Sequence, residues 1–251
     1  MTWTLNYGDC LDPVTGLASL ADKSIDVCLC DPPYEAEAHT KGRRTKRNGG
    51  VCVPEVLPFA AITESVREAA SLEIARTTKR WALVFCQTEA AQMWAQALSA
   101  GGLDYVRTMV WIKPDGQPQF TGDRPGVGYE SIVVAHAKGR KRWNGGGRTG
   151  VFSALREKGP RVCGQNIGAP HPTTKPLPLM RELVSLFTDP GELVLDPFAG
   201  SGSTGVACGM LGRRFIGWEL DANYYEIARR RLSGEEAKPR PEQPSLFGGA
   251  L

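Results

Sequence analysis

The chain has 251 residues, of which 41% are hydrophobic, and its formal net charge is +3. This length and apolar content suffice for the core of a single domain, and no apolar run is long enough to predict a membrane-spanning helix. Seven cysteines are scattered without a C-x-x-C pair and the three histidines lack metal-ligand spacing, which argues against a disulfide framework and predicts no metal site. The first residues lack the basic and apolar regions of a signal peptide, so a cytoplasmic protein is expected.

Short apolar runs alternate along the chain with segments of helical periodicity. The predicted strands are residues 25–30, 81–86, 105–112, 131–137, 193–195 and 215–218. The predicted helices are residues 59–75, 88–98, 177–187, 203–211 and 222–232. This alternation predicts an α/β fold with a mostly parallel sheet, helices on both faces, and ligands bound beyond the carboxyl ends of the strands.

Two long polar segments, residues 35–58 and 138–172, interrupt this pattern, and loops of such length are usually functional or disordered. Each contains basic residues without an acidic partner, next to the expected active edge of the sheet, which favours contact with phosphates. These residues are Lys41, Arg43, Arg44, Lys46 and Arg47 in the first segment, and Lys138, Arg140, Lys141, Arg142 and Arg148 in the second. The alternative is that both are solvated flexible loops. The tail, residues 233–251, is rich in Pro, Glu and Lys and is expected to be unstructured.

A glycine-rich turn follows the strand predicted at residues 193–195. The run from Gly200 to Gly205 matches G-x-G-x-x-G, which alone could be a tight turn that lets a helix pack on a strand. Glu219 closes the next strand, at the place where an acidic residue would bind ribose hydroxyls. These residues predict a nucleoside cofactor without saying which one. A nicotinamide-dependent oxidoreductase would fit them, but it would leave Asp31-Pro32-Pro33-Tyr34 and both basic segments unexplained.

Four stretches together resemble the motifs of one family. Asp196-Pro197-Phe198-Ala199-Gly200-Ser201-Gly202 resembles the S-adenosylmethionine motif of the amino-group (N6-adenine or N4-cytosine) DNA methyltransferases, and Asp31-Pro32-Pro33-Tyr34 resembles their catalytic motif. The catalytic stretch comes first, as in the beta arrangement of that family. His171-Pro172-Thr173-Thr174-Lys175-Pro176 and Asn6-Tyr7-Gly8-Asp9-Cys10 are similar to two further family segments. The resemblance implies a Rossmann-like, doubly wound methyltransferase domain over residues 1–232, with the two long segments inserted for DNA recognition.

The resemblance also implies roles at the cofactor site. Gly200 and Gly202 would let the backbone approach the methionine part of S-adenosylmethionine, and Glu219 would bind its ribose. Asp9 would accept from the adenine amine, although it could instead be a turn aspartate after Gly8. Asp196 would lie near the cofactor's amino group, and Lys175 or its neighbours near the carboxylate. The other residues expected to bind the cofactor are Cys10, Pro197, Phe198, Ala199, Ser201 and Leu220.

The catalytic stretch suits transfer to an exocyclic amine, whose lone pair is delocalised into the base. The Asp31 carboxylate and the Pro32 carbonyl could accept the two N–H bonds and draw that lone pair out of the plane, since proline keeps the turn rigid. Pro33 biases Pro32 toward an extended conformation. A base could stack on the Tyr34 ring, a contact worth roughly 1–3 kcal/mol. The amine is unreachable inside a duplex, so base flipping is expected.

The expected substrate is the N6 amine of adenine in double-stranded DNA, because an aspartate at the first motif position more often accompanies adenine in the family. The alternative is the N4 amine of cytosine. A DNA-binding protein without catalysis and an RNA methyltransferase are further alternatives. The resemblance implies a bacterial or phage-encoded enzyme, and family members of this arrangement often form homodimers, although no feature of the sequence shows an interface. In the tail, Gln243-Pro244-Ser245-Leu246-Phe247 resembles the peptide that docks bacterial replication proteins to the sliding clamp, although it could be a chance match.

Overall fold

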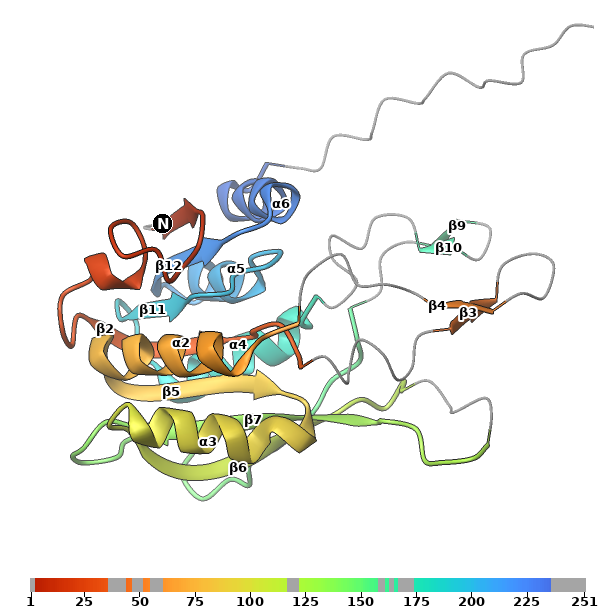
Figure 1. Cartoon of the computed structure of the whole chain (residues 1–251), viewed down its shortest axis with the longest axis horizontal. Coiled ribbons are helices and arrows are strands. Elements are labelled where there is room, and N and C mark those ends of the chain that lie inside the picture. The colour runs from red at the N-terminus through yellow and green to blue at the C-terminus, as the bar shows by residue number, and fades with distance from the viewer. Residues whose placement is uncertain are drawn as a thin grey trace, which may run out of the picture.

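The computed structural model describes residues 3–35, 61–116, 122–157 and 174–235, together with the backbone of four short strands at 44–46, 52–54, 161–162 and 165–166. Eight strands form the main sheet in the order β1-β12-β11-β2-β5-β7-β6-β8 (Figure 1). Their bounds are β1 Trp3–Tyr7, β2 Ile25–Cys30, β5 Thr78–Cys86, β6 Asp104–Ile112, β7 Tyr129–His136, β8 Val151–Ser153, β11 Leu193–Asp196 and β12 Arg214–Glu219. The helices are α2 Glu64–Thr77, α3 Ala91–Ala100, α4 Leu177–Phe187, α5 Ser203–Met210 and α6 Ala222–Ser233, with 3-10 turns at Leu17–Ser19 and Thr88–Ala90.

The sheet is mostly parallel, as predicted. Of its described strands, only β7 runs antiparallel, and it does so against both of its neighbours, β5 and β6. From β2 the chain passes through α2 to β5, which lies next to β2 on the side away from β11. From β11 it passes through α5 to β12, which lies next to β11 on the side away from β2. Because β2 and β11 are neighbours, paired at Val194 with Val27, the strand order reverses between them. Doubly wound sheets bind ligands at such a switch point.

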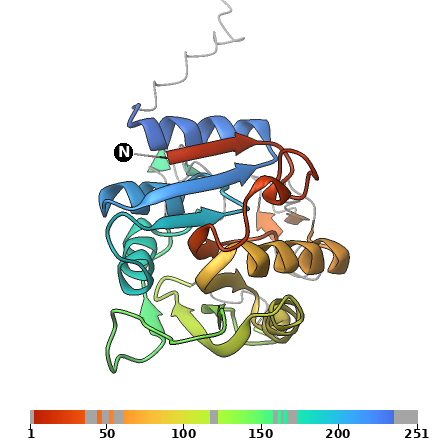
Figure 2. The same cartoon turned by 90° about the vertical axis from the view of Figure 1, so that its left-hand side faces the viewer.

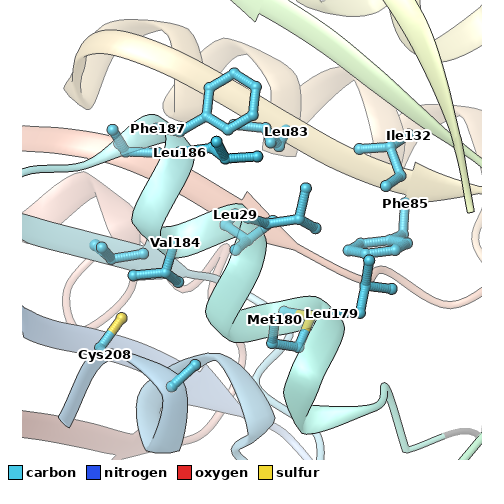
Figure 3. Close-up of a cluster of buried hydrophobic side chains, with 14 of the residues drawn as sticks. Leu29, Leu83, Phe85, Ile132, Leu179, Met180, Val184, Leu186, Phe187 and Cys208 are labelled. Carbon is cyan, nitrogen blue, oxygen red and sulfur yellow. The ribbon is translucent and has the colours of Figure 1, made fainter. Parts of the chain in front are cut away.

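Helices cover both faces of the sheet, with α4, α5 and α6 on one face and α2 and α3 on the other (Figure 2). Alternation along β2 divides the core, because successive side chains of a strand point to opposite faces. Val27 and Leu29 join the cluster under α4, where Leu183 is also buried. Leu83 and Phe85 belong to the same cluster (Figure 3). The cysteines of β2 join the other cluster, against α2 and α3. The doubly wound α/β fold predicted from the sequence is therefore confirmed.

The element bounds follow local chemistry. The strand at 25–30 and the helix at 177–187 have the predicted bounds. The helix predicted from residue 59 begins at Glu64, because the Thr63 hydroxyl caps it by accepting from the Val66 N–H at 3.3 Å. The strand predicted from residue 81 begins at Thr78. The edge strand β1 was not predicted, nor were β8 and the short pairs β3 (Arg44–Lys46) with β4 (Cys52–Pro54) and β9 (Arg161–Val162) with β10 (Gln165–Asn166).

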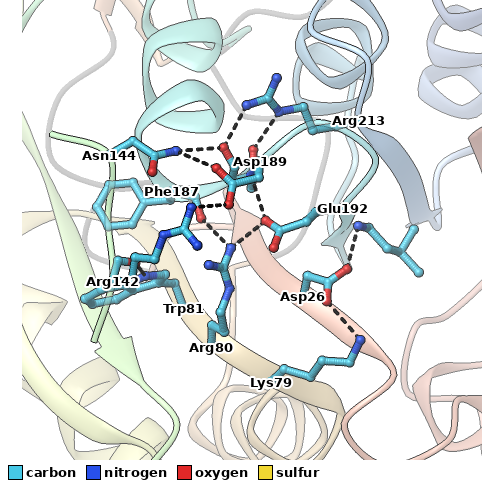
Figure 4. A network of polar contacts seen from close by, with 12 residues as sticks. Asp26, Lys79, Arg80, Trp81, Arg142, Asn144, Phe187, Asp189, Glu192 and Arg213 are labelled. Carbon is cyan, nitrogen blue, oxygen red and sulfur yellow. Dashed lines mark hydrogen bonds and ion pairs between the residues drawn. The ribbon is translucent and has the colours of Figure 1, made fainter. Parts of the chain in front are cut away.

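The second basic segment does not lie where it was expected. Because β7 is antiparallel, it pairs Ser131 with Cys86 and His136 with Trp81, so the residues that follow β7 lie at the amino ends of the parallel strands. Acidic partners are present as well: Arg142 donates to Asp189 at 2.8 Å (Figure 4). Lys141 and Arg148 contact Asp104 and Glu182 at 3.9 and 2.5 Å. The expectations that this cluster lies at the active edge and lacks acidic partners are wrong.

Several predictions fall outside the described residues. They concern Lys41, Arg43 and Arg47, residues 171–173 of the segment before α4, and the tail peptide at 243–247. Arg44 and Lys46 are described only as backbone of β3. No helix within the described ranges combines the length and apolar character that a bilayer crossing requires.

Candidate active site

A cavity of about 590 Å³ opens at the carboxyl ends of β1, β2, β11 and β12, at the switch point of the sheet. It is lined by both stretches that the sequence singled out. The predicted site residues on its wall are Asp9, Cys10, Asp31, Pro32, Pro33, Tyr34, Lys175, Asp196, Pro197, Phe198, Ala199, Gly200, Ser201, Glu219 and Leu220. Asp31 and Asp196, 165 positions apart in the sequence, thus line one cavity because β2 and β11 are adjacent and parallel.

The glycine-rich turn forms one wall of the cavity. Gly200 has a φ of +53° and Gly202 a φ of +79°, in the left-handed region that favours glycine. Gly200 lies on the cavity wall, but Gly202 does not. A Cβ on Gly202 would lie 3.0 Å from the Cβ of Ala228, and one on Gly205 would lie 2.6 Å from Leu232. Gly202 therefore serves the close packing of α5 on α6, and its expected approach to the cofactor stays a prediction.

Two carboxylates brace this turn from the ends of neighbouring strands. Asp196 accepts from the Phe198 N–H at 3.0 Å and from the Thr204 hydroxyl at 2.6 Å. Glu219 accepts from the Gly200 N–H at 2.7 Å and from the Asp221 N–H at 2.8 Å. Burial raises the pKa of Asp196 to about 7 and also raises the pKa of Glu219. Each carboxylate oxygen retains a lone pair for a ligand in the cavity.

The segment after β1 reaches the same end of the cavity. Tyr7 pairs with Glu219 across β1 and β12, and the Gly8 N–H donates to the Glu219 carbonyl at 2.9 Å. One oxygen of Asp9 accepts from the Leu11 N–H at 2.9 Å, the bond of a turn aspartate, while Asp9 also lines the cavity. Burial raises the pKa of the Cys10 thiol to about 12, so this side chain is neutral at physiological pH. The structure thus brings together the residues predicted to bind adenosine.

The catalytic stretch lines the cavity directly after β2. The Lys175 ammonium donates to Oδ2 of Asp31 and lies 3.4 Å from Oε2 of Glu130. It also lies over the rings of Tyr34 and Phe85, at 5.4 and 5.1 Å from their centroids. Lys175 was expected near the cofactor carboxylate. The structure instead places its ammonium on Asp31, while the neighbouring Thr174 contacts Ser201 of the glycine-rich turn at 3.3 Å.

The two carboxylate oxygens of Asp31 differ in their hydrogen bonds. Within the described part of the chain, its buried Oδ1 has no hydrogen-bond partner, whereas Lys175 holds Oδ2. Burial raises the pKa of Asp31, and the Lys175 charge partly offsets that rise. Conversely, burial lowers the pKa of Lys175, but Asp31 and Glu130 outweigh burial and raise it. An unpartnered buried acceptor is costly, so Oδ1 is a site at which a donor would be stabilised.

These geometric features agree with the comparison with known proteins. A model of the DNA methylase family, N6_N4_Mtase, matches residues 25–230. The chain belongs to this family. The putative methylase YubD of Escherichia coli strain K12 is 31% identical over 232 residues, which span 90% of this chain and 88% of that protein. The type II methyltransferase M.HinfI of Haemophilus influenzae is 27% identical, over 97% of this chain and 71% of that enzyme.

Solved structures of methyltransferases share the fold of this methylase. The M1.HpyAVI–SAM complex matches with a TM-score of 0.67 at 24% identity, over 92% of this chain and 99% of that one. The cytosine-N4-specific PvuII DNA methyltransferase matches with a TM-score of 0.68 at 14% identity, over 92% of this chain and 86% of that one. The Rossmann-like methyltransferase fold is therefore confirmed.

Enzymes of this family use S-adenosylmethionine, and the cavity fits that cofactor. Its volume lies in the range usual for ligand sites. Asp196 and Glu219 offer carboxylate oxygens for an amino group and a ribose diol, and their negative charges suit a sulfonium. At Gly200 a Cβ would meet only the Phe198 carbonyl oxygen, at 3.9 Å, so the backbone here borders free space. These residues would hold the cofactor in the cavity that Asp31 also lines.

Sequence reasoning missed three charged residues of the methylase site. Glu130 accepts from the Tyr34 hydroxyl at 2.7 Å and from Lys113 at 2.5 Å. Arg231 on α6 donates to the Ser201 carbonyl at 2.6 Å and to the Ser201 hydroxyl at 2.9 Å, and so anchors the glycine-rich turn. Nothing in the sequence marks Glu130 or Lys113. Arg231 stands in a run of three arginines near the end of a helix. The sequence therefore does not show which of the three points toward the glycine-rich turn.

Proposed function

We propose that this methylase transfers the methyl group of S-adenosylmethionine to the N6 amine of adenine in double-stranded DNA, after flipping the base into the cavity. The observation that carries the proposal is Asp31, which lines the same cavity as the glycine-rich turn and whose buried Oδ1 has no hydrogen-bond partner among the described residues. A flipped base could present its amine to this oxygen. The N–H of that amine is the donor that the oxygen lacks.

The residues of the catalytic stretch would polarise the amine. Asp31 Oδ1 would accept one N–H and the Pro32 carbonyl the other, which draws the nitrogen lone pair out of the plane of the base. The bound cofactor supplies an electrophilic methyl group on a sulfonium. As the nitrogen gains that methyl group it loses a proton, and Asp31 is a carboxylate positioned to receive it. Its pKa, raised mainly by burial, suits a proton acceptor.

The surrounding residues would hold the base. The Tyr34 ring lines the cavity beside Asp31 and offers a flat apolar face. Its hydroxyl donates to Glu130 at 2.7 Å, which restrains the ring. Because the amine of a paired base is enclosed in the stack, the base must leave the duplex to reach these groups. Phosphate contacts would come from the basic residues of segment 41–47, which follows Tyr34 closely in the chain.

Adenine is the proposed base because aspartate stands at the first position of the catalytic stretch. Cytosine N4 is the second candidate, since both amines present two hydrogens and Asp31 and Pro32 would polarise either one. Analysis of the methylated nucleoside separates them. Unmethylated phage DNA is incubated with radiolabelled S-adenosylmethionine and the protein, digested to nucleosides and separated by chromatography.

Label in N6-methyldeoxyadenosine supports the proposal, and label in N4-methyldeoxycytidine replaces adenine with cytosine. Absence of label from both, with cofactor binding confirmed by calorimetry, overturns the proposed DNA amino-methylation. A parallel reaction with RNA tests that substrate under the same conditions. Methylation-aware sequencing of DNA from a host that expresses the protein then locates the target site.

We also propose that the peptide from Gln243 to Phe247 docks to a bacterial sliding clamp. A leucine–phenylalanine pair after a glutamine could fill a small apolar pocket at the end of a tail. The test is a pull-down with purified clamp, in which Leu246→Ala and Phe247→Ala should each abolish binding. Binding that is absent, or insensitive to both substitutions, rules the tether out.

A further inference from the structure

Four charged side chains of alternating sign form a chain of ion pairs that ends at Asp31. Lys113 donates to Oε1 of Glu130 at 2.5 Å, and Lys175 lies 3.4 Å from Oε2 of the same carboxylate. Lys175 in turn donates to Oδ2 of Asp31. The Lys175 side chain is only 6% exposed, and those of Lys113 and Glu130 are 14% and 13% exposed. The Asp31 side chain is 23% exposed. Two ammonium groups and two carboxylates thus balance in a largely buried cluster, in which an unpaired charge would be costly.

Glu130 occupies the centre of this arrangement because of the fold. It is the second residue of β7, the antiparallel strand, so the amino end of β7 lies at the same edge of the sheet as the carboxyl end of β2, with β5 between them. Oε1 of its carboxylate accepts from Lys113. Oε2 accepts from the Tyr34 hydroxyl and pairs with Lys175. Burial alone would raise the pKa of Glu130, but Lys175 and Lys113 outweigh it and lower the pKa to about 2. Glu130 is therefore ionised throughout the physiological range.

We infer that Glu130 is a positioning residue for methyl transfer, which holds both the acceptor Asp31 and the stacking ring of Tyr34 in place. Through Lys175 it keeps the ammonium on Oδ2 of Asp31, so that Oδ1 stays without a partner among the described residues. Through the Tyr34 hydroxyl it fixes the ring on which the base would stack. This inference rests on the proposed function, and it adds a residue that lies outside the sequence motifs.

The alternative is that Glu130 only stabilises the fold. An ion pair of similar construction lies at the opposite edge of the sheet, where Glu192 accepts from Arg80 at 2.5 Å and from the Asp189 N–H at 2.8 Å (Figure 4). Glu192 is remote from the cavity lining. It therefore provides a matched control, because Glu192→Gln removes a comparable buried charge without touching the base site.

The pH dependence of transfer separates the two readings. Beyond its burial, the pKa of Asp31 responds to Lys175 and Lys113, which lower it, and to Glu130, which raises it. The charge of Asp31 in turn raises the pKa of Tyr34, Cys30 and Cys86, which are neutral, and that of Asp196 on the neighbouring strand. Transfer requires ionised Asp31, so activity is lost as pH falls through the pKa of Asp31, and this fall is the acid limb of the pH profile. Glu130→Gln removes a group that raises this pKa, so it should move the acid limb to lower pH. Lys175→Met removes a group that lowers this pKa, so it should move the limb to higher pH.

The experiment measures kcat against pH on unmethylated phage DNA for the full chain and its variants. Glu130→Gln should lower kcat at the pH optimum by about tenfold or more, the size of loss that small misplacements of reacting groups produce. Its affinity for S-adenosylmethionine, measured by calorimetry, should match the wild type. Glu130→Asp keeps the charge but shortens the reach, so it should lower kcat and leave the acid limb in place. Glu192→Gln should change neither kcat nor the limb.

The results that overturn the inference are distinct from failure of the proposed function. If the wild-type protein does not methylate DNA, the proposed function fails. If the wild type is active and Glu130→Gln keeps its kcat, or if the limb moves in the same direction in Glu130→Gln and Lys175→Met, the positioning role fails. Should neither Glu130 variant fold, Tyr34→Phe removes only the hydroxyl that Glu130 holds, and an unchanged kcat in that variant also overturns the inference.

Discussion

Asp196 and Thr204 are joined by a hydrogen bond of 2.6 Å, in which the threonine hydroxyl of α5 donates to the carboxyl group at the end of β11. Both residues are buried, with 2% and 3% exposure. The bond closes the glycine-rich turn against the strand, and the second Asp196 oxygen accepts from the Phe198 N–H. Despite these donors, burial raises the pKa of Asp196 to about 7. Its charge state therefore changes near neutral pH in the free protein.

This pKa predicts that cofactor binding depends on pH. A cationic cofactor favours the ionised form of Asp196, and that form is lost as pH falls through about 7. We expect affinity for S-adenosylmethionine to be about tenfold higher at pH 8 than at pH 6, the change that one linked proton produces. Calorimetry at both pH values checks this. In Asp196→Asn the difference between the two pH values should disappear; if it persists unchanged, Asp196 is not the linked group.

The left-handed turn predicts unequal costs for two glycine substitutions. Gly202→Ala and Gly212→Ala both place a Cβ on a residue of positive φ, a strain of roughly 1–2 kcal/mol. Only at Gly202 would the new Cβ also meet a neighbour, at 3.0 Å from Ala228, whereas nothing lies within 4 Å at Gly212. Urea unfolding should show the larger loss for Gly202→Ala, and only that variant should lose cofactor affinity. Equal losses in both variants would contradict the packing role of Gly202.

Arg231 is predicted to support cofactor binding from behind the turn. Its guanidinium donates to the Ser201 carbonyl and hydroxyl and lies 3.3 Å from the Ser203 hydroxyl. Arg231→Met should weaken binding of S-adenosylmethionine by roughly tenfold, which corresponds to the ~1.5 kcal/mol of a charge-assisted hydrogen bond. The control is Arg230→Met, since Arg230 is 48% exposed and pairs with Glu226. Isothermal titration should find wild-type affinity for S-adenosylmethionine in the control. Wild-type affinity in Arg231→Met would contradict the role of Arg231 in cofactor binding.

DNA binding should depend on the first basic segment and not on the second. Neutralising Arg43, Arg44, Lys46 and Arg47 should flatten the salt dependence of DNA affinity, by about 0.9 in the log–log slope for each cation that contacts a phosphate. Neutralising Lys138, Arg140 and Lys141 should leave the slope unchanged, because these residues follow β7 at the edge opposite the cavity. Fluorescence anisotropy over a salt series measures both slopes. The reverse pattern would place the DNA on the far edge.

The strand ends that build the cavity were predictable from local sequence. An apolar run followed by Asp31-Pro32 or Asp196-Pro197 marks the end of a buried strand, and the doubly wound rule brings such ends to one edge. What could not be predicted was the direction of β7. Reversal of this strand places Glu130 at the cavity and carries Lys138 to the far edge, so one topological fact explains both a missed site residue and a wrong expectation.

The three glycines of the turn show a second limit of sequence reasoning. They form one motif, yet Gly200 lies on the cavity wall while Gly202 and Gly205 face α6 and its neighbours. Lys175 likewise stands in a segment that suggested the cofactor carboxylate, but its long side chain reaches Asp31. Spacing along the chain predicts which residues gather at an edge. The direction in which each side chain points depends on tertiary packing.

Single-turnover transfer by the isosteric variant Asp31→Asn tests the central claim most directly. The amide keeps the shape of the side chain but cannot act as the carboxylate that accepts an amine proton, and its pair with Lys175 is lost. We predict that the rate of methyl transfer to DNA falls by roughly 10²–10⁴-fold, as expected for loss of a catalytic base. Binding of S-adenosylmethionine should survive. A wild-type transfer rate in this variant would contradict the role assigned to Asp31 and, with it, the mechanism built around the cavity.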